Sequence, residues 1–438
     1  MELVAAPWRH SFAPERWPEN ELWTYDGALP GPTIRAVQGS RLRVIVENRL
    51  AEETTVHWHG IRVPNAMDGV PHLTQAPIPP GGRFVYEFDL PDAGTYWYHP
   101  HQRSFEQVGR GLYGALIVEA AESPVVDRDV VWVLSDWRLL PTGELSDDFG
   151  NFFDVMHAGR VGNTVTVNGA LPTDFPVRTG ERIRLRLINA ANARIFALEF
   201  SGHRPAVIAT DGHPVEPHEP VGGRMILGPA MRVDLILDAT GDPAARHAVR
   251  DSFYKDLAYD LLHLAYEAKP AAGGRAGDAI PRLAPNTMPE PDEAMAERRV
   301  MTFEGGMMGG MMGAMMDGAQ ADMNQMMKQG MAWAVNGVAN TGHVMEPALV
   351  LERGRSYVLE LRNQTAWYHP IHLHGHAFRV VRRNGRPEPF RPWQDTVLIP
   401  PRETADIAFV ADNPGDWMIH CHILEHQAGG MMAVLRVT

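Results

Sequence analysis

Cysteine is the scarcest residue of this chain, because Cys421 is the only one among 438 residues. A single cysteine cannot form an internal disulfide, so cysteine usage does not indicate the redox compartment. No apolar run is long enough to cross a bilayer. Residues 1–10 also lack the charged-then-apolar pattern of a signal peptide. These absences argue against a membrane span, and they leave either a cytosolic protein or a mature form whose leader has been removed.

Positive charge is also limited, and lysine occurs only at Lys255, Lys269 and Lys328. The formal net charge of −13 argues against nucleic acid or an anionic membrane as the main partner, and it suits the attraction of cations. Hydrophobic residues make up 45% of the chain, an ordinary share for a globular protein with a buried core. The length favours three domains, at about 150 residues each.

One template is repeated three times along the chain. Each copy opens on a short turn-like segment, at residues 25–30, 167–172 and 335–338. Each continues with a glycine, an alternating strand and an asparagine, in the ranges 39–48, 180–189 and 354–363. Nine residues further on, the first and third copies have His57 and His372, whereas the middle copy has Leu198. The repeat therefore indicates three related domains, of which the middle one lacks these histidines.

Short alternating strands, such as residues 41–47, 182–188 and 357–361, are separated by Gly and Pro. This pattern favours an all-β fold of Greek-key β-sandwich domains. We predict domain 1 at residues 1–122, domain 2 at residues 123–269, a linker at residues 270–296 and domain 3 at residues 297–438. The linker is rich in Ala, Gly and Pro.

A methionine-rich insertion at residues 301–331 holds eleven of the 22 methionines. Its paired methionines recur every four residues, a period that would place them along one face of a helix, although the intervening glycines weaken that helix. Thioethers are soft donors that favour monovalent copper. The candidate ligands for a substrate copper ion are Met307, Met308, Met311, Met312, Met315 and Met316. A mobile low-complexity insertion is the alternative interpretation.

The C-terminal stretch from His420 to Met431 contains the ligand types of a blue electron-transfer copper: one thiolate, imidazoles and a weak thioether. Side chains alternate along an extended backbone, so Cys421 would point away from His420 and His422. A metal at the cysteine would then be connected through the backbone to metals at the two histidines.

Ten of the 20 histidines fall into four motifs, which are His57/His59, His99/His101, His369/His372/His374 and His420/His422/His426. A His-x-His pair on a strand projects both imidazoles to one face. Pairing of the first and third domains would bring eight imidazoles to a shared interface, which suits a cluster of three metals with open positions for dioxygen. His369 is left over, and with Cys421, His426 and Met431 it completes the cysteine-centred site.

These motifs resemble those of the three-domain multicopper oxidases, the group of laccases and bacterial cuprous oxidases, over nearly the whole chain. The resemblance implies three cupredoxin-like domains, four copper ions, export to the periplasm or cell exterior, and four-electron reduction of dioxygen to water. It implies a type 1 copper on His369, Cys421, His426 and axial Met431, and a type 2 copper on His57 and His372. The type 3 pair would be held by His59, His99, His101, His374, His420 and His422.

The implied reaction passes single electrons from substrate to the type 1 site and through Cys421 to His420 and His422. Water formation needs protons, and Asp68, in the loop 64–69, matches an acid that orients the cluster water and relays protons. Bacterial cuprous oxidases often carry a glutamate directly after the last type 1 histidine, where this chain has Gln427. This substitution puts that part of the usual proton path in question.

Two features favour cuprous ion as the substrate: the place of the methionine-rich insertion matches that of bacterial cuprous oxidases, and the net charge is acidic. Those enzymes often place Asp and Met just ahead of the first type 1 histidine, where this chain has Gln-Thr-Ala-Trp-Tyr at residues 364–368. Trp367 is either part of a pocket for phenols or a packed interface aromatic.

We therefore expect a monomeric cuprous oxidase that also oxidises phenols and aromatic amines, and that has no nucleic-acid or membrane partner. A laccase acting mainly on phenols is the alternative, followed by a non-enzymatic copper-binding protein.

Overall fold

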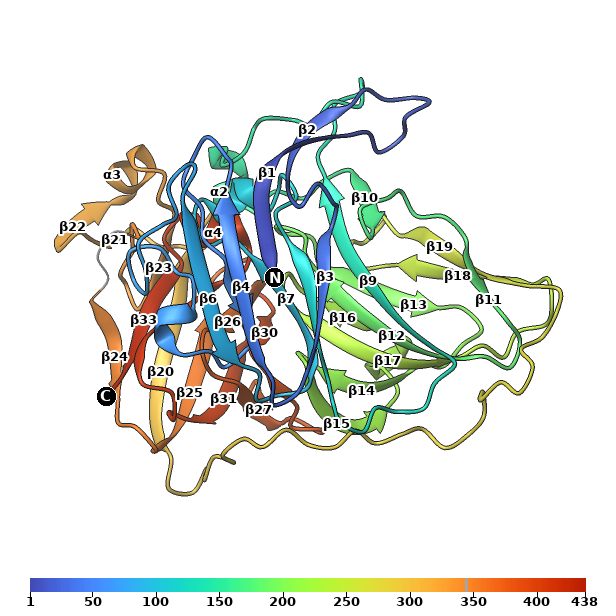
Figure 1. Cartoon of the computed structure of the whole chain (residues 1–438). Helices are drawn as coiled ribbons and strands as arrows, with labels where there is room; N and C mark the ends of the chain where they lie inside the picture. The colour runs from blue at the N-terminus through green and yellow to red at the C-terminus, as the bar shows by residue number, and fades with distance from the viewer. Residues whose placement is uncertain (343–345) are drawn as a thin grey trace.

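The computed structural model describes residues 1–342 and 346–438. Strands dominate this part of the chain, and its α-helices are short: α1 (Ser104–Gln107), α2 (Phe152–Met156), α3 (Met323–Lys328) and α4 (Leu424–Ala428). None of the helices in the described ranges is long and apolar enough to span a membrane. The predicted all-β fold class is confirmed (Figure 1).

The first unit consists of two four-stranded sheets that share one buried core. The first sheet has the order β2 (Asn20–Tyr25), β1 (Glu2–His10), β4 (Arg41–Asn48) and β6 (Arg83–Asp89). The second has the order β3 (Gly31–Val37), β8 (Gly114–Glu119), β7 (Gly94–His99) and β5 (His57–His59). A 3₁₀ turn, η1 (Asn65–Met67), follows β5.

The middle unit has a six-stranded and a five-stranded sheet around a second core. The larger has the order β10 (Thr164–Val167), β9 (Arg128–Trp137), β12 (Arg182–Asn189), β17 (Arg232–Asp238), β14 (Ala206–Thr210) and β15 (His213–His218). The smaller has the order β11 (Phe175–Val177), β19 (Tyr259–Tyr266), β18 (Arg246–Asp251), β13 (Phe196–Phe200) and β16 (Met225–Leu227). A 3₁₀ turn, η2 (Val221–Gly223), precedes β16.

The third unit is built in the same way around a third core. One sheet has the order β23 (Trp333–Val335), β20 (Glu297–Gly305), β25 (Ser356–Asn363), β31 (Thr404–Val410), β27 (Phe378–Arg383) and β28 (Arg386–Pro387), and β29 (Trp393–Gln394) also pairs with β27. The other has the order β24 (Pro347–Leu351), β33 (Met432–Val437), β32 (Gly415–Cys421), β26 (His369–Leu373) and β30 (Thr396–Ile399). A long yellow segment without strands or helices joins β19 to β20 along the lower edge of Figure 1.

The three units repeat the same strand pairing. In each, the opening strand of one sheet runs parallel to its neighbour: β1 to β4, β9 to β12 and β20 to β25. The opening strand of the other sheet does the same: β3 to β8, β11 to β19 and β24 to β33. The remaining pairings among the sandwich strands are antiparallel, so the threefold repeat in the sequence is a repeat of one folding unit.

The repeated turn segments have one backbone geometry. Both central residues have positive φ in Asp26-Gly27 (55° and 65°), Asn168-Gly169 (51° and 77°) and Asn336-Gly337 (50° and 75°). Two consecutive positive φ angles define a type I′ hairpin turn, for which Asp-Gly and Asn-Gly are the preferred pairs. Each of the three copies of the template therefore opens with the same hairpin turn.

The expected helix in the methionine-rich insertion does not form. After β20 the chain turns at Gly305 and Gly306, then makes a two-stranded hairpin of β21 (Gly313–Met316) and β22 (Ala319–Asp322), followed by α3. A Cβ at Gly306 would lie 2.0 Å from the ring of Trp333, so this turn packs directly on that tryptophan. The glycines thus override the four-residue methionine period, because they supply turns that a helix does not have.

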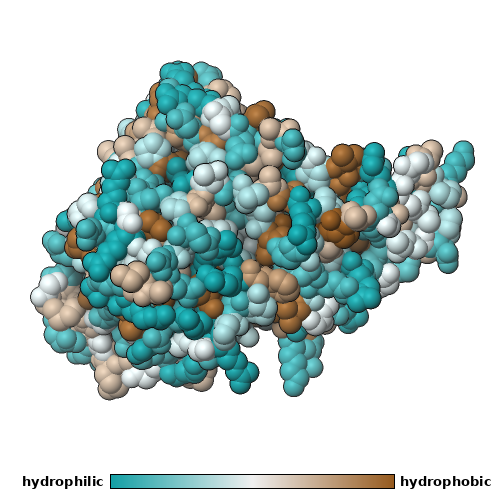
Figure 2. All heavy atoms as spheres, turned by 90° about the horizontal axis from the view of Figure 1, so that it is seen from below, coloured by the Kyte–Doolittle hydropathy of each residue, from teal (hydrophilic) through white to brown (hydrophobic). Residues whose placement is uncertain are grey.

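On the face seen from below (Figure 2), hydrophobic residues lie in small separate patches. Figure 2, which views the molecule from below, shows mostly hydrophilic residues on this face, with hydrophobic ones scattered among them. Such scattering is normal for the exterior of a globular protein.

Candidate metal centre

Strand pairing brings the four histidine motifs together two by two. In the first unit β5 pairs with β7 so that His57 lies opposite His99. In the third unit β26 pairs with β32 so that His372 lies opposite His420. Only the His57/His59 pair lies wholly within a strand, since the second histidine of each other pair falls just beyond the strand end.

The eight histidines of these pairs converge where the first and third units meet, and all are buried. Their ring nitrogens form three groups, each within 4.8 Å: His57, His59 and His372; His59, His99 and His422; and His101, His374 and His420. Closest are the Nε2 atoms of His374 and His420, at 3.1 Å, and those of His99 and His422, at 3.4 Å. We call these eight residues the histidine cluster.

Hydrogen bonds on the outer side of the cluster fix which nitrogen faces inward in five of its rings. Four rings donate Nδ1–H to a backbone carbonyl: His57 to Asp68 at 2.8 Å, His372 to Asp395 at 2.9 Å, His99 to Pro100 at 3.0 Å and His420 to Cys421 at 2.9 Å. His59 is reversed, since its Nε2–H donates to Asp395 Oδ1 at 3.0 Å. The inner nitrogens keep their lone pairs, as metal-ligating histidines do.

The cluster has the properties of a metal site. Six cluster histidines have a pKa well below the usual value, because burial and the neighbouring rings disfavour the charged form. These are His59, His99, His101, His374, His420 and His422. Neutral imidazoles therefore face one another with unshared electron pairs. The buried Nε2 atoms of His57, His101 and His372 have no hydrogen-bond partner in the described ranges. Metal ions satisfy such atoms, and imidazole suits copper.

Asp68 lies against the cluster and is fully buried, although the sequence suggested a surface loop. Its Oδ2 accepts a hydrogen bond from His374 Nδ1 at 2.9 Å, and its carbonyl holds His57. Its other carboxylate oxygen, Oδ1, accepts no hydrogen bond from the described residues. Gly69 keeps the loop close to the cluster, because its φ is +82° and a Cβ there would lie 1.9 Å from the carbonyl oxygen of Val56.

A second carboxylate, Asp395, bridges two cluster rings and is anchored by the middle unit. Besides His59, it lies 3.4 Å from His372 Nδ1. Its two oxygens accept hydrogen bonds from Arg232 in β17, at 2.8 and 2.5 Å. Burial opposes ionisation, but the charge of Arg232 holds the pKa of Asp395 well below its usual range. Buried Asp211 accepts hydrogen bonds from the backbone N–H groups of Arg232, Asp395 and Thr396.

The cysteine site lies in the third unit, on the other side of β32. Cys421 Sγ lies 3.4 Å from His369 Nδ1 and 3.6 Å from His426 Nδ1, and these two nitrogens are 3.2 Å apart. Met431 is buried and its carbonyl accepts the Cys421 N–H. Burial raises the pKa of the Cys421 thiol, and it lowers the pKa of His426 to about 3. A metal that replaces the thiol proton would stabilise both groups.

Neutral groups orient the two imidazoles of the cysteine site. His369 Nε2–H donates to the hydroxyl of Thr365 at 2.7 Å, and Thr365 is buried. His426 Nε2–H donates to the carbonyl of His157, in the middle unit, also at 2.7 Å. Sequence reasoning identified neither partner, just as it missed Asp395 and Arg232.

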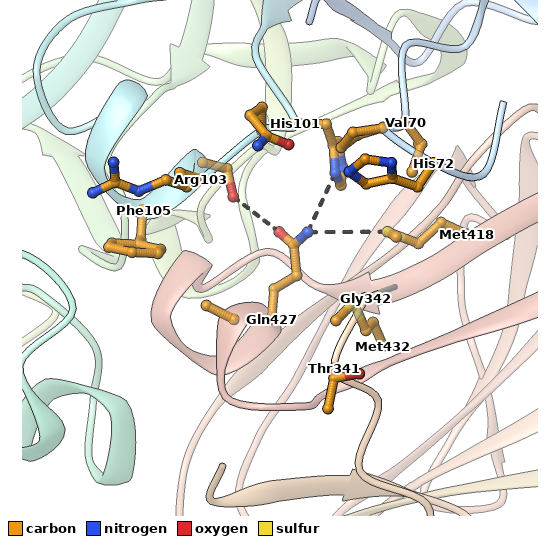
Figure 3. Close-up of a pocket in the computed structure, with 14 residues that line it drawn as sticks. Val70, His72, His101, Arg103, Phe105, Thr341, Gly342, Met418, Gln427 and Met432 are labelled. Carbon is orange, nitrogen blue, oxygen red and sulfur yellow. Dashed lines mark hydrogen bonds between the residues drawn. The ribbon is translucent and has the colours of Figure 1, made fainter. Parts of the chain in front are cut away.

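A pocket of about 240 Å³ reaches His101 from the surface between the first and third units. Figure 3 shows Gln427 at its centre, hydrogen-bonded to Ser104 at 3.2 Å and to His101 Nδ1 at 3.2 Å. The amide thus takes the position next to a cluster histidine, and it carries no ionisable proton.

The six candidate methionines separate by exposure. Met307, Met308, Met312 and Met315 are exposed, Met311 is half-buried, and Met316 is buried in a small core with Met326 and Met331. Met307 and Met308 follow a turn that packs on Trp333, whose ring lies 4.3 Å from that of His426.

Comparison with known proteins identifies the family. Multicopper oxidase models match residues 9–123, 128–263 and 316–438. The multicopper oxidase MmcO of Mycobacterium tuberculosis is 34% identical, over 93% of this chain and 81% of that protein. A crystal structure of a multicopper oxidase from Pseudomonas thermotolerans is 34% identical with a TM-score of 0.87, covering 100% and 98% of the two chains.

A third relative is the Campylobacter jejuni multicopper oxidase described as a metallo-oxidase. It is 26% identical with a TM-score of 0.81, covering 100% of this chain and 90% of that one. Copper is the cofactor of these proteins, and dioxygen is their oxidant. This chain belongs to the multicopper oxidase family.

Proposed function

We propose that the chain binds one type 1, one type 2 and two type 3 copper ions. The type 1 ligands would be His369, Cys421, His426 and Met431, and the type 2 ligands His57 and His372. The type 3 ions would take His59, His99 and His422 on one side, and His101, His374 and His420 on the other. Support comes from the inward lone pairs and the grouping of the rings. Copper, when bound, would supply the one-electron redox steps and the open positions for dioxygen.

Cys421 would connect the two sites. Its sulfur faces His369 and His426, while the rings of its chain neighbours His420 and His422 face His374 and His99. A path of covalent bonds therefore joins the type 1 side of β32 to the histidine cluster.

Asp68 would relay protons to the oxygen-reducing cluster. Its Oδ2 orients His374, while its buried Oδ1 is available to a water in the cluster. General acid–base groups must lie within hydrogen-bond reach of the atom that receives the proton. Gln427, by contrast, orients His101 and lines the solvent pocket without transferring a proton.

We propose cuprous ion as the main substrate. The observation that carries this proposal is the exposure of Met307 and Met308, 42% and 68%, directly beyond the turn that packs on Trp333 over the type 1 ligands. Thioethers prefer monovalent copper, and the net charge of −13 attracts cations. The relative described as a metallo-oxidase is consistent with this substrate class.

Oxidation of phenols and aromatic amines is the second candidate function. It is favoured by the half-buried Trp367, whose ring lies 5.5 Å from that of His157, and by the exposed Phe153, which stacks on His157. These rings offer a planar substrate an aromatic surface near the type 1 ligands.

The wider organisation follows from these assignments. We propose that residues 1–122 and 297–438 supply all ligands of the four resident copper ions, that residues 123–269 form a domain without a resident copper ion, and that residues 270–296 link it to domain 3. We also propose that the protein acts as a monomer in the periplasm or outside the cell.

Oxygen uptake tests the choice of substrate. Cuprous ion and a simple phenol are each supplied to the copper-loaded protein, to a double variant with Met307→Leu and Met308→Leu, and to a control with Met295→Leu. Met295 is 77% exposed and lies outside the insertion. The double variant is expected to lower the rate with cuprous ion and to leave the phenol rate unchanged. Equal rates for all three proteins would mean that Met307 and Met308 do not deliver copper, and a natural protein that oxidises the phenol but not cuprous ion would leave phenol oxidation as the main activity.

A further inference from the structure

The outward edges of both type 1 imidazoles are closed to a reductant. Thr365, which receives the His369 Nε2–H, is buried and also donates its N–H and hydroxyl to Asn363 Oδ1. The corresponding edge of His426 is covered by the carbonyl of His157. Because both outer nitrogens are hydrogen-bonded, the residues that cover them offer a path for electrons to these rings.

His157 is a half-buried histidine in the middle unit, directly after α2. Its Nδ1–H donates to the carbonyl of Phe153 at 2.7 Å, and its ring stacks on Phe153 at 4.1 Å with an angle of 20°. Phe153 is 69% exposed, so the stacked pair lies at the surface. The fixed Nδ1–H leaves Nε2 with its lone pair, and no described residue hydrogen-bonds to it. A carbonyl that fixes the other ring nitrogen is the usual support of a metal-ligating histidine.

The methionine-rich insertion is attached at the same place. The Met307 N–H donates to the carbonyl of Met156, the residue before His157, at 2.9 Å. The Met307 carbonyl accepts the Trp367 indole N–H at 3.0 Å, and the Trp367 ring lies edge-on to His157. These bonds attach the backbone of Met307, an exposed methionine, to the residue before His157 and to Trp367, whose ring contacts that of His157.

The turn that presents Met308 is also held in an unusual conformation. Met308 has a φ of 64°, a region that bulky L-residues avoid, and its carbonyl accepts a hydrogen bond from Arg402 at 3.0 Å. Residues kept in such conformations concentrate at ligand sites, where the surrounding structure imposes them.

We propose that His157 Nε2, together with the thioethers of Met307 and Met308, forms the docking site for the cuprous ion that reduces the type 1 centre. This inference rests on the proposed cuprous oxidase function and assigns its substrate ligand. Imidazole and thioether together suit monovalent copper, whereas the cupric product favours nitrogen and oxygen donors and is released.

The site also provides the path for the electron. Covalent bonds lead from the His157 ring to its own carbonyl, and one hydrogen bond leads from there to the His426 ring. Each cuprous ion loses one electron and leaves as a cupric ion. Four such oxidations, with four protons, convert one dioxygen to two waters.

The matched control is His218, which has the same local arrangement away from the metal sites. Its Nδ1–H donates to the carbonyl of Glu216 at 2.8 Å, and its ring stacks on Phe390 at 3.7 Å with an angle of 11°. The test variants are therefore His157→Phe and His218→Phe, each of which keeps a stacked aromatic ring and the backbone carbonyl.

The first measurement is cuprous ion binding to the copper-loaded, reduced protein without oxygen, in competition with a chromophoric cuprous chelator. The natural chain and His218→Phe are expected to bind one additional cuprous ion with the same affinity. His157→Phe is expected to bind this ion at least about tenfold more weakly, since loss of even an outer-shell partner costs that much metal affinity. The double variant with Met307→Leu and Met308→Leu, which leaves α2 intact, is expected to show the same loss.

The second measurement is oxygen uptake. His157→Phe is expected to raise KM for cuprous ion more than KM for a phenol, whereas His218→Phe is expected to leave both values and the visible absorption of the thiolate-bound copper unchanged. If cuprous binding and KM are unaffected while the natural chain oxidises cuprous ion, the docking site is wrong and the proposed function stands. If phenol KM alone rises, the stacked pair is an aromatic subsite and the docking site is again wrong. If the natural chain does not oxidise cuprous ion, both proposals fail.

Discussion

The histidine cluster and the cysteine site differ in the charge of the groups that orient their imidazoles. Two buried carboxylates, Asp68 and Asp395, contact cluster rings. At the cysteine site the corresponding acceptors are the Thr365 hydroxyl and the His157 carbonyl, both neutral. Reduction of dioxygen consumes protons and builds positive charge on the metals, so acids are useful there. A centre that only passes electrons gains nothing from proton donors, and neutral surroundings keep its charge changes small.

Loss of the sulfur removes the connection between the two sites and gives the largest expected effect. Cys421→Ser is expected to abolish oxygen uptake with cuprous ion and with phenol alike, because the sulfur of Cys421 is joined through its own backbone to the neighbouring cluster histidines His420 and His422. Copper content should fall by one ion per chain, with the cluster still loaded. Measurable turnover with either substrate would show that electrons reach the cluster without Cys421.

Removing the acid at the cluster tests whether the carboxylates serve proton supply. Asp68→Asn is expected to lower oxygen turnover by about 10²- to 10⁴-fold, the usual contribution of general acid–base catalysis. The visible absorption of the cysteine site and its reduction by substrate without oxygen should not change. Unaltered turnover would reduce Asp68 to an orienting residue for His374.

Arg232 keeps the carboxylate of Asp395 ionised. Removing Arg232 therefore tests how much an unpaired buried carboxylate lowers the free energy of unfolding. Arg232→Met leaves Asp395 buried without its cation, and breaking such a pair costs about 3–5 kcal/mol of unfolding free energy. Chemical denaturation of the metal-free protein measures the loss. The exposed pair Arg204–Glu219 supplies the control, because Arg204→Met should cost no more than about 1 kcal/mol. A similar small loss for both variants would contradict this role.

Glu425 gives a smaller effect that depends on pH. It is buried beside the cysteine site, where it accepts hydrogen bonds from the Arg160 N–H and the Asn192 amide, and burial raises its pKa to about 7. A pKa raised by folding gives stability that is fully present below the unfolded value of about 4.5 and is lost as pH rises through 7. Charging this group would end the neutrality of the cysteine site.

Glu425→Gln is therefore expected to remove that pH dependence. The metal-free variant should match the natural protein near pH 4.5 and exceed its stability above pH 7, by about 3 kcal/mol at most. Denaturation of both proteins across this range measures the difference. Parallel stability curves would mean that Glu425 does not titrate in this window.

The sequence was informative wherever the chemistry is carried by residue type and spacing. The alternating strands predicted the β-sandwich units, and the histidine motifs predicted side chains that the structure brings together. The helix expected across Met307–Met316 was wrong, because Gly305 and Gly306 turn the chain before one can begin. The assignment of each ligand to a particular copper ion stays a prediction, supported by geometry.

The supporting contacts could not be read from spacing, because they join residues that are distant in the chain. Arg232 and Asp395 are 163 positions apart, and the His157 carbonyl reaches His426 across 269. Every residue type has a backbone carbonyl, so residue identity does not reveal which carbonyl orients His426. The one available signal was the presence of Arg232, Asp234 and Asp238 among the apolar residues of β17, since buried charges are paired.

The distribution of ligands along the chain also determines when the protein can mature. The ligands of the first unit lie at residues 57–101, whereas His420 and His422 follow more than 300 residues later. The cluster therefore cannot form until a loop of over 300 residues has been closed. Copper loading of the cluster is consequently a late step that follows the docking of the first and third units, and a chain cut before His420 would keep only part of the ligand set.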